Sequence, residues 1–358
     1  MKDSLVLEQK ENKRKTYLDI AKGIGIILVV IGHCPQVFNP LKQWIYAFHM
    51  PLFFVVSGLV WNHASRKKGE SSIFKYILTR AKRLIIPCFI WGLLYMIVNS
   101  IIHGSFSPRQ IVSLFYGSQA GFSRADSLSS LWFFPCLFIA VCLFEFLQIV
   151  LSGRKYSHLI LGTVSIGCAL ISYFLPHFDR GWPWSLDVSL FALALIICGY
   201  LGKELIKILS ERIIVSVIVL IVSFVLLTLT FSINLKFISI NNVDMAGRHF
   251  GNLGLYVLDA LSGCLMILSF SCIGSRWDLF EKAFSFIGRR TIPILVIHKP
   301  IVQGLGNLLS RTILPKAIIV VISSGVAIGF SLLVYQVLHR WIPILFGEKK
   351  QATNRGLS

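Results

Sequence analysis

The chain has 358 residues, of which 55% are hydrophobic and only 14% are charged. A soluble protein keeps about a quarter of its residues charged, so the mean hydropathy of +0.73 excludes an ordinary water-soluble fold. The net charge of +19 lies in short segments between apolar runs, a distribution that orients membrane proteins and does not indicate nucleic-acid binding.

Ten apolar runs are long enough to cross a bilayer as helices. They cover residues 18–38, 44–63, 84–102, 131–151, 158–175, 186–202, 213–232, 253–273, 291–309 and 317–339, with ends uncertain by several residues. The sequence therefore predicts an all-α polytopic membrane protein with about ten transmembrane helices. A basic cytoplasmic N-terminal segment at 1–16 is expected before a membrane domain at 17–345. A cytoplasmic tail is expected at 346–358, disordered from Gly347 to Ser358.

The basic residues predict which side each connection faces. Alternate connections hold 25 Lys and Arg residues on one side and 8 on the other. The positive-inside rule therefore predicts that both termini face the cytoplasm. On the outer side, a short turn is expected at 39–43, and the long loops at 103–130 and 233–252 have the composition to hold a polar neutral ligand.

The eight cysteines fall almost entirely inside the apolar runs and show no C-x-x-C spacing. They are expected to be small buried hydrophobic residues, and no metal site is predicted.

Ionisable residues inside the membrane are functional candidates because burying them in lipid is costly. Lys22 and His33 are eleven residues apart, which places them on one face of the first helix, about 16 Å apart along its axis. This stripe either lines a passage through the membrane, or Lys22 merely extends to the interface.

His49 in the second helix enters the membrane at a depth similar to that of His33. A lone histidine on an apolar helix is more often a hydrogen-bonded packing residue, but two imidazoles at one depth favour a site. Their near-neutral pKa suits general base catalysis.

Arg80 and Arg83 are spaced i and i+3, so they share one face where the third helix enters from the cytoplasm. Two guanidiniums on one face bind phosphates well. A plain positive-inside anchor explains them equally, since Arg66, Lys67 and Lys68 lie nearby. Only their combination with Lys22 and His33 favours a nucleotide-bearing thioester donor.

Asp187 follows a Trp-Pro-Trp-Ser-Leu run, and Trp132 opens the fourth helix on the same outer side. Aromatic residues at this level ordinarily anchor a protein in the interface. A carboxylate among aromatic rings also suits sugar binding. Glu145, Asp259 and His298 either contribute to a site or form hydrogen bonds between helices, which is the commoner role.

Several of these residues fall in an ordered set of motifs. They are Tyr17-Leu-Asp19-Ile-Ala-Lys22-Gly-Ile-Gly-Ile…Gly32-His33, Phe48-His49-Met50-Pro51-Leu-Phe-Phe…Ser57-Gly58, Arg80-x-x-Arg83, Trp132-Phe133, Pro183–Asp187 and Ile-Leu-Val-Ile-His298. Together they resemble the membrane acyltransferase 3 family, nearest its fucose 4-O-acetylase-like branch, over residues 16–340.

The resemblance implies an integral-membrane enzyme of the bacterial cytoplasmic membrane, with acetyl-CoA or another acyl-CoA as donor substrate and no bound cofactor. The expected acceptor is a hydroxyl of an extracytoplasmic glycan or lipid-linked oligosaccharide, and glycan assembly or export machinery is a possible partner. Some members carry a fused hydrolase-like domain, so the membrane domain either completes the transfer itself or passes the acyl group to a partner.

Within this interpretation, Arg80 and Arg83 bind the donor and His33 acts as the catalytic base. Asp19 and Lys22 complete the catalytic set, and they either tune the stripe electrostatically or contact the donor. The residues expected to bind the acceptor or support the site are His49, Trp132, Asp187 and His298. An acyl-enzyme on Cys34 is disfavoured, because adjacent helical residues point about 100° apart. The alternatives are a glycolipid transporter or flippase, and a scaffold for polysaccharide export that needs no His33.

Overall fold

The computed structural model describes residues 2–62, 73–125, 128–238 and 243–348, and gives only the helical backbone for residues 2–15. Within these ranges the chain forms α-helices and short 3-10 turns, and an isolated β-bridge joins Asp244 to His249. Ten of its helical spans are long and apolar enough to cross a membrane. The predicted all-α polytopic fold is therefore confirmed. The predicted basic run at 66–68 and the tail at 349–358 lie outside the described residues.

The ten spans are formed by single helices or by a helix with a short adjoining turn. They are α1 (Lys2–His33), α2 (Asn39–Tyr46) with α3 (His49–Val60), α5 (Ile73–His103), η1 (Ser129–Trp132) with α8 (Phe133–Val150), α9 (Ser157–Phe174), η2 (Pro183–Ser185) with α10 (Leu186–Leu201), α12 (Ile213–Asn234) with η3 (Leu235–Phe237), α13 (Leu253–Gly274), α15 (Thr291–Leu309) and α16 (Lys316–Leu338). The connections contain α6 (Pro108–Tyr116), α7 (Gln119–Arg124), α11 (Lys203–Glu211) and α14 (Asp278–Gly288), and η4 (Pro343–Phe346) follows α16.

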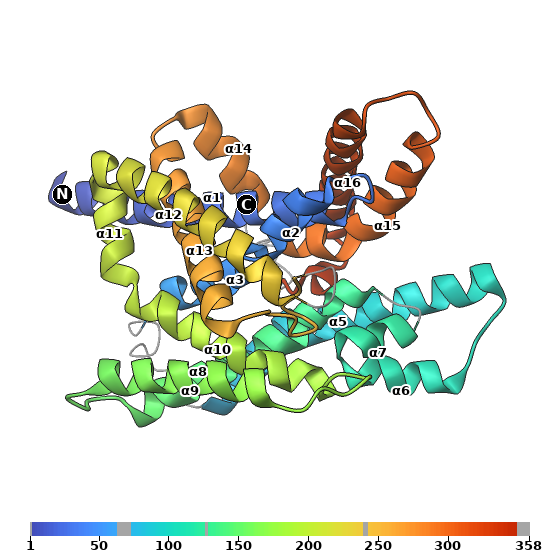
Figure 1. Cartoon of the computed structure of the whole chain (residues 1–358), viewed down its shortest axis with the longest axis horizontal. Helices are drawn as coiled ribbons and strands as arrows, with labels where there is room; N and C mark the ends of the chain where they lie inside the picture. Colours follow the sequence, from blue (N-terminus) through green and yellow to red (C-terminus); the bar gives the residue numbers. More distant parts are fainter. Residues whose placement is uncertain (1, 63–72, 126–127, 239–242, 349–358) are drawn as a thin grey trace, which may run out of the picture.

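The connections gather at two opposite ends of the molecule (Figure 1). The start of α1, the α8–α9 connection and α11 lie at one end, and the α5–α6 and α15–α16 connections lie at the other. This arrangement agrees with the predicted alternation of sides. Which end faces the cytoplasm still rests on the charge distribution, so the inward termini remain a prediction.

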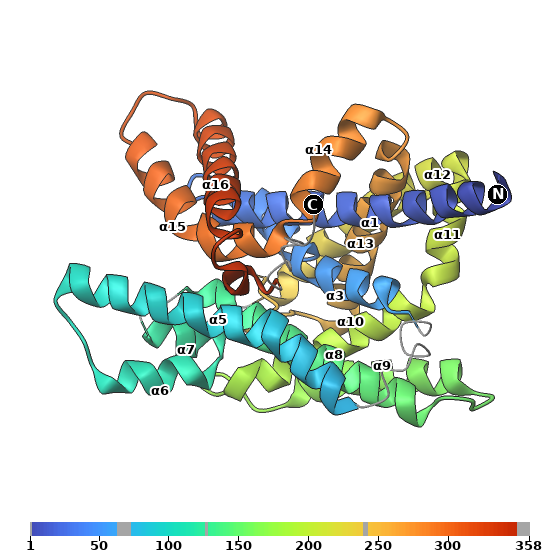
Figure 2. The same cartoon turned by 180° about the vertical axis from the view of Figure 1, so that it is seen from behind.

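Eight of the ten spans fall into an inner and an outer group, and the spans of α8 and α15 are intermediate. More than half of each span is buried for α1, α2–α3, α10 and α13, whereas less than a third is buried for α5, α9, α12 and α16. The outer helices expose large apolar side chains such as Ile214, Leu229 and Val321, which suits contact with lipid. Helix α1 packs against α13, α14 and α15 (Figure 2).

The first two spans differ from their predicted boundaries. Helix α1 ends at His33, earlier than expected, because Pro35 cannot continue a helix and restricts the residue before it. The turn predicted at 39–43 is wrong: those residues are helical, and the turn occupies 34–38. The second span breaks at Phe48 and restarts at His49, so Pro51 lies in the first turn of α3, where its missing N–H needs no partner.

The third span begins earlier than predicted. Helix α5 starts at Ile73 instead of residue 84, so Arg80 and Arg83 lie inside the helix, and it continues through Pro87. The outer loop predicted at 103–130 contains two short helices, α6 and α7, whose first turns are capped by the side chains of Ser107 and Ser118.

Glycines allow α3 and α10 to cross in direct backbone contact. A Cβ atom on Gly58 would lie 2.0 Å from the carbonyl oxygen of Ile196, and one on Gly199 would lie 2.0 Å from that of Val55. Small residues commonly permit such close approach between membrane helices.

We expect Gly58→Ala to destabilise the fold by about 1–3 kcal/mol, the usual cost of overpacking. Gly162→Ala in α9 is the matched control, because a Cβ there would meet nothing within 4 Å. Thermal unfolding of the two purified variants in detergent measures the difference. Equal stabilities would show that the α3–α10 crossing adjusts without cost.

Candidate functional site

A cavity of about 540 Å³ opens between α1, α3, α5, α8 and α15. Four cationic side chains line it, against two carboxylates: Lys22, Arg80, Arg83 and Arg289, with Glu145 and Glu348. This excess of positive charge suits a polyanionic ligand. The cavity is termed the cationic cavity below.

A close contact between α1 and α14 builds one wall of the cationic cavity. A Cβ on Gly288 would overlap the carbonyl group of Asp19, so the two backbones touch at that point. The contact places Arg289 beside Asp19, with 3.8 Å between Nη1 and Oδ2. The other carboxylate oxygen of Asp19 pairs with Lys22 Nζ at 2.6 Å. Asp19 therefore holds two cations at the edge of the cavity.

The opposite wall comes from α5. Arg80 and Arg83 both line the cavity, as their i, i+3 spacing predicts. The guanidinium of Arg80 lies over the ring of Tyr76, 4.9 Å from its centroid. Such stacking fixes the plane of an arginine, and the N–H groups that are not hydrogen-bonded to Tyr76 remain available to an anion.

Two further contacts adjoin these arginines. Glu145 accepts a hydrogen bond of 2.8 Å from the indole of Trp61. The segment around η4 packs against α5, where Trp91 donates a hydrogen bond of 2.9 Å to the carbonyl of Leu345. Phe346 and Glu348 line the cavity beyond that point. The predicted domain boundary at 345 thus cuts through a segment that forms the cavity wall.

A second, smaller cavity of about 70 Å³ contains the histidines. It is lined by Val29, His33, Tyr46, His49, Met50, Gln119, Ser129, Ser130, Trp132, Asp244, Met245 and Leu295. His33 and His49 come from different helices and face the same space, as predicted. The cavity is termed the histidine cavity below.

Three histidines share one orientation. The Nδ1 atoms of His33, His49 and His298 lie 2.8, 2.9 and 2.8 Å from the carbonyl oxygens four residues earlier. A carbonyl only accepts hydrogen bonds, so each neutral ring carries its proton on Nδ1 and keeps a lone pair on Nε2. That tautomer is the one a general base acting through Nε2 requires.

His33 and His298 form a contacting pair. Their ring centroids lie 5.1 Å apart with the planes nearly perpendicular. His298 is fully buried, and its Nε2 has no hydrogen-bond partner among the described residues. His33 is partly exposed to the histidine cavity. His33 is thus the member of the pair that can reach a substrate, with His298 packed behind it.

The two cavities come close together inside the bundle. Ile292 lines the cationic cavity and Leu295 the histidine cavity, and these neighbours on α15 are about 4.5 Å apart along the helix axis. Lys22 and His33 therefore open into different cavities, so the stripe predicted on α1 is divided between the two.

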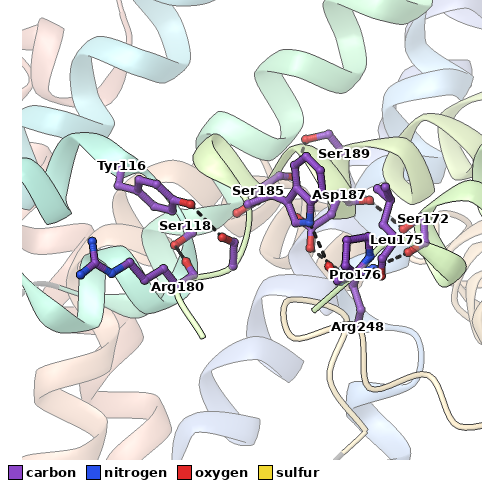
Figure 3. Close-up of polar contacts among 12 residues, drawn as sticks. Tyr116, Ser118, Ser172, Leu175, Pro176, Arg180, Ser185, Asp187, Ser189 and Arg248 are labelled. Carbon is purple, nitrogen blue, oxygen red and sulfur yellow. Dashed lines mark hydrogen bonds and ion pairs between the residues drawn. The ribbon is translucent and has the colours of Figure 1, made fainter. Parts of the chain in front are cut away.

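Asp187 occupies neither cavity. Its Oδ2 pairs with Arg248 Nε at 2.7 Å, and both residues are buried. The guanidinium of Arg248 also donates to the carbonyl oxygens of Ser172, Leu175 and Pro176 (Figure 3). A carboxylate engaged in this way favours a role in folding over the predicted role in acceptor binding.

The remaining candidates lie at the histidine cavity or outside both cavities. Trp132 lines the histidine cavity. Lys299 donates a hydrogen bond of 2.5 Å to the hydroxyl of Ser129, which lines the same cavity. Cys34 is fully buried and lines neither cavity, which further disfavours an acyl-enzyme.

Sequence reasoning missed Asp244 and Gln119, which meet at the histidine cavity with 3.4 Å between Nε2 and Oδ2. Burial raises the pKa of the Asp244 carboxyl, and hydrogen bonds from the Ala246 amide and Gln119 oppose that shift. The sequence also contains no sign of a site at Arg289, which looks like one of the basic residues that orient the chain in the membrane. The polar composition of the two outer loops was the available signal for Asp244 and Gln119, but it does not indicate which residues meet.

Comparison with known proteins gives a match over nearly the whole chain. A family model described as an acyltransferase domain matches residues 15–336. The nodulation protein NolL of Mesorhizobium japonicum is 29% identical over 198 residues, half of this chain and half of that protein. NolL of Sinorhizobium fredii is 38% identical over 90 residues, or 22% of this chain and 24% of that protein. This chain thus aligns with half or less of the length of these relatives, and no solved structure matches it.

Proposed function

This chain belongs to the acyltransferase domain family, and on that premise we propose that it moves an acetyl or other small acyl group from acyl-CoA to a hydroxyl of an extracytoplasmic glycan. The acceptor is a surface polysaccharide, lipopolysaccharide, exopolysaccharide or lipid-linked oligosaccharide. The protein lies in the bacterial cytoplasmic membrane, with the cationic cavity on the cytoplasmic side. Glycan assembly or export machinery is the expected partner.

The juxtaposition of the two cavities is the observation that carries this proposal. The cationic cavity offers guanidinium and ammonium groups to the phosphates of CoA. The two cavities approach each other at Ile292 and Leu295, so a pantetheine arm that extends from the cationic cavity at this point would bring the thioester toward His33. The histidine cavity is small, with a volume of about 70 Å³, which favours a small acyl group.

The chemistry follows from the tautomer of His33. Its Nε2 removes the proton of the acceptor hydroxyl while that oxygen attacks the thioester carbonyl, forming a C–O bond. The tetrahedral intermediate then collapses, the C–S bond breaks, and the CoA thiolate leaves and takes the proton from His33. The products are an O-acyl ester and CoA. Lys22, held by Asp19, contacts the donor phosphates, since Lys22 opens into the cationic cavity.

The function is tested by comparing surface glycans of host cells that express the chain with those of cells that lack it. NMR and mass spectrometry of the glycans measure O-acetyl esters, and labelled acetyl-CoA supplied to inside-out vesicles identifies the donor. We expect an ester signal that requires the chain and carries the label. A transporter would change the amount of exported glycan without adding an ester. That result would overturn the proposal.

We expect Arg80→Gln to raise the KM for acetyl-CoA about tenfold or more with little change in kcat, because a charge-assisted hydrogen bond contributes about 1.5–3 kcal/mol. Arg83→Gln should act in the same direction. Lys82→Gln is the matched control, since Lys82 is exposed on the same turn and does not line the cavity. Equal effects of all three variants would instead indicate a positive-inside anchor.

A further inference from the structure

We propose that the hydroxyl of Ser129, polarised by Lys299, stabilises the negative oxygen of the tetrahedral intermediate. This inference rests on the proposed function and adds a second catalytic group to it. Ser129 touches the reacting atoms, and Lys299 is a positioning residue that acts through Ser129.

The geometry begins with the position of Ser129. This residue opens the 3-10 turn η1, three residues before Trp132, and it lines the histidine cavity together with His33. Lys299 follows His298 on α15, and α15 packs against η1. One turn of α15 therefore supplies both the imidazole behind His33 and the cation behind Ser129.

The hydrogen bond between the two residues fixes the direction of the Ser129 proton. Lys299 Nζ is a donor only, so in the 2.5 Å contact the Ser129 oxygen must accept. The hydroxyl hydrogen is then left to donate elsewhere, and the described part of the chain shows no other hydrogen bond to Ser129. Ser129 lines the cavity, so a carbonyl oxygen bound there is the available acceptor.

Charge supports the same assignment. Lys299 is half-buried within a membrane span, and the described residues place no carboxylate within ion-pair distance of its ammonium group. Acyl transfer creates a negative oxygen when the acceptor attacks the thioester carbonyl. A fixed hydroxyl donor backed by a cation stabilises that oxygen more than the neutral carbonyl that precedes it.

The test measures acetyl transfer to the glycan in membrane vesicles with wild type, Ser129→Ala, Ser129→Thr and Lys299→Met at matched amounts of folded protein. Loss of one oxyanion donor costs roughly 10²-fold or more in kcat. We expect that loss for Ser129→Ala with the KM for acetyl-CoA unchanged, recovery of most activity in Ser129→Thr, and an intermediate loss for Lys299→Met.

Ser331→Ala is the control. Ser331 is buried in α16, bonds the Ala327 carbonyl of its own helix and lines neither cavity. A wild-type kcat in Ser129→Ala, or an equal loss in Ser331→Ala, would overturn the inference while the proposed function stands. A large loss in Ser130→Ala alone would also overturn it, by moving the donor to the neighbouring hydroxyl in the cavity. Absence of ester with wild type would instead refute the proposed function itself.

Discussion

His33→Gln is expected to lower acetyl transfer by roughly 10²–10⁴-fold, the usual contribution of a general base. Glutamine keeps a polar side chain of similar size in the histidine cavity but cannot take a proton. The donor arginines line the other cavity, so the KM for acetyl-CoA should stay near its wild-type value. Ester content of the surface glycans, measured by NMR or mass spectrometry, gives the cellular readout, and vesicle kinetics give kcat and KM.

The pH dependence separates a base from a packing residue. With wild type, kcat/KM should rise with pH as the free imidazole of the base loses its proton, and this limb should disappear in His33→Gln. His103→Gln is the control, because His103 is exposed at the end of α5 and lines neither cavity. Undiminished ester in cells expressing His33→Gln would show that another group removes the proton.

Much of the fold was accessible from the sequence because apolar length and basic connections depend on local composition. The predicted helix boundaries were wrong where the backbone conformation of single residues sets the end of a helix. Pro35 ends the first helix early, and the break at Phe48 splits the second span just before His49. Periodicity alone also predicts one stripe for Lys22 and His33, because a helical wheel gives the face of a residue but not the cavity into which its side chain opens.

The candidate site was predicted best where its residues lie close in sequence. Arg80 and Arg83 share one helix, so their spacing places both at one cavity. Long-range pairs were not accessible in this way: Gln119 meets Asp244, and Lys299 meets Ser129, only through the packing of separate spans. A single sequence contains no spacing rule for such contacts.

Asp187 shows the same limit most clearly. An acidic residue beside tryptophans indicates a sugar site, but the partner of Asp187 is Arg248, which is separated from it in the sequence by the rest of the α10 span and by the α12 span. Arg248 has a positive φ of 56°, a conformation that costs a non-glycine residue energy and persists where surrounding contacts enforce it. Its bonds to the carbonyls at the end of α9 supply those contacts (Figure 3).

Arg248→Ala is therefore expected to destabilise the protein by about 3–5 kcal/mol, because it leaves the buried Asp187 carboxylate without its partner. Arg180→Ala is the matched control, since Arg180 has the same charge and is exposed in the α9–α10 connection. Thermal unfolding in detergent measures both variants. The double variant with Asp187→Ala should lose less than the sum of the two single losses, because the residues act as a pair.

Asp187→Asn decides between the structural role and sugar binding. Asp187→Asn removes one charge of a buried ion pair, so it should lower the unfolding temperature. The folded variant should keep the wild-type KM for the glycan. Asp187 lines neither cavity, so no direct contact with the acceptor is expected. A raised glycan KM at unchanged unfolding temperature would restore Asp187 to the acceptor site and would require the α9–α10 connection to open toward the histidine cavity during the reaction.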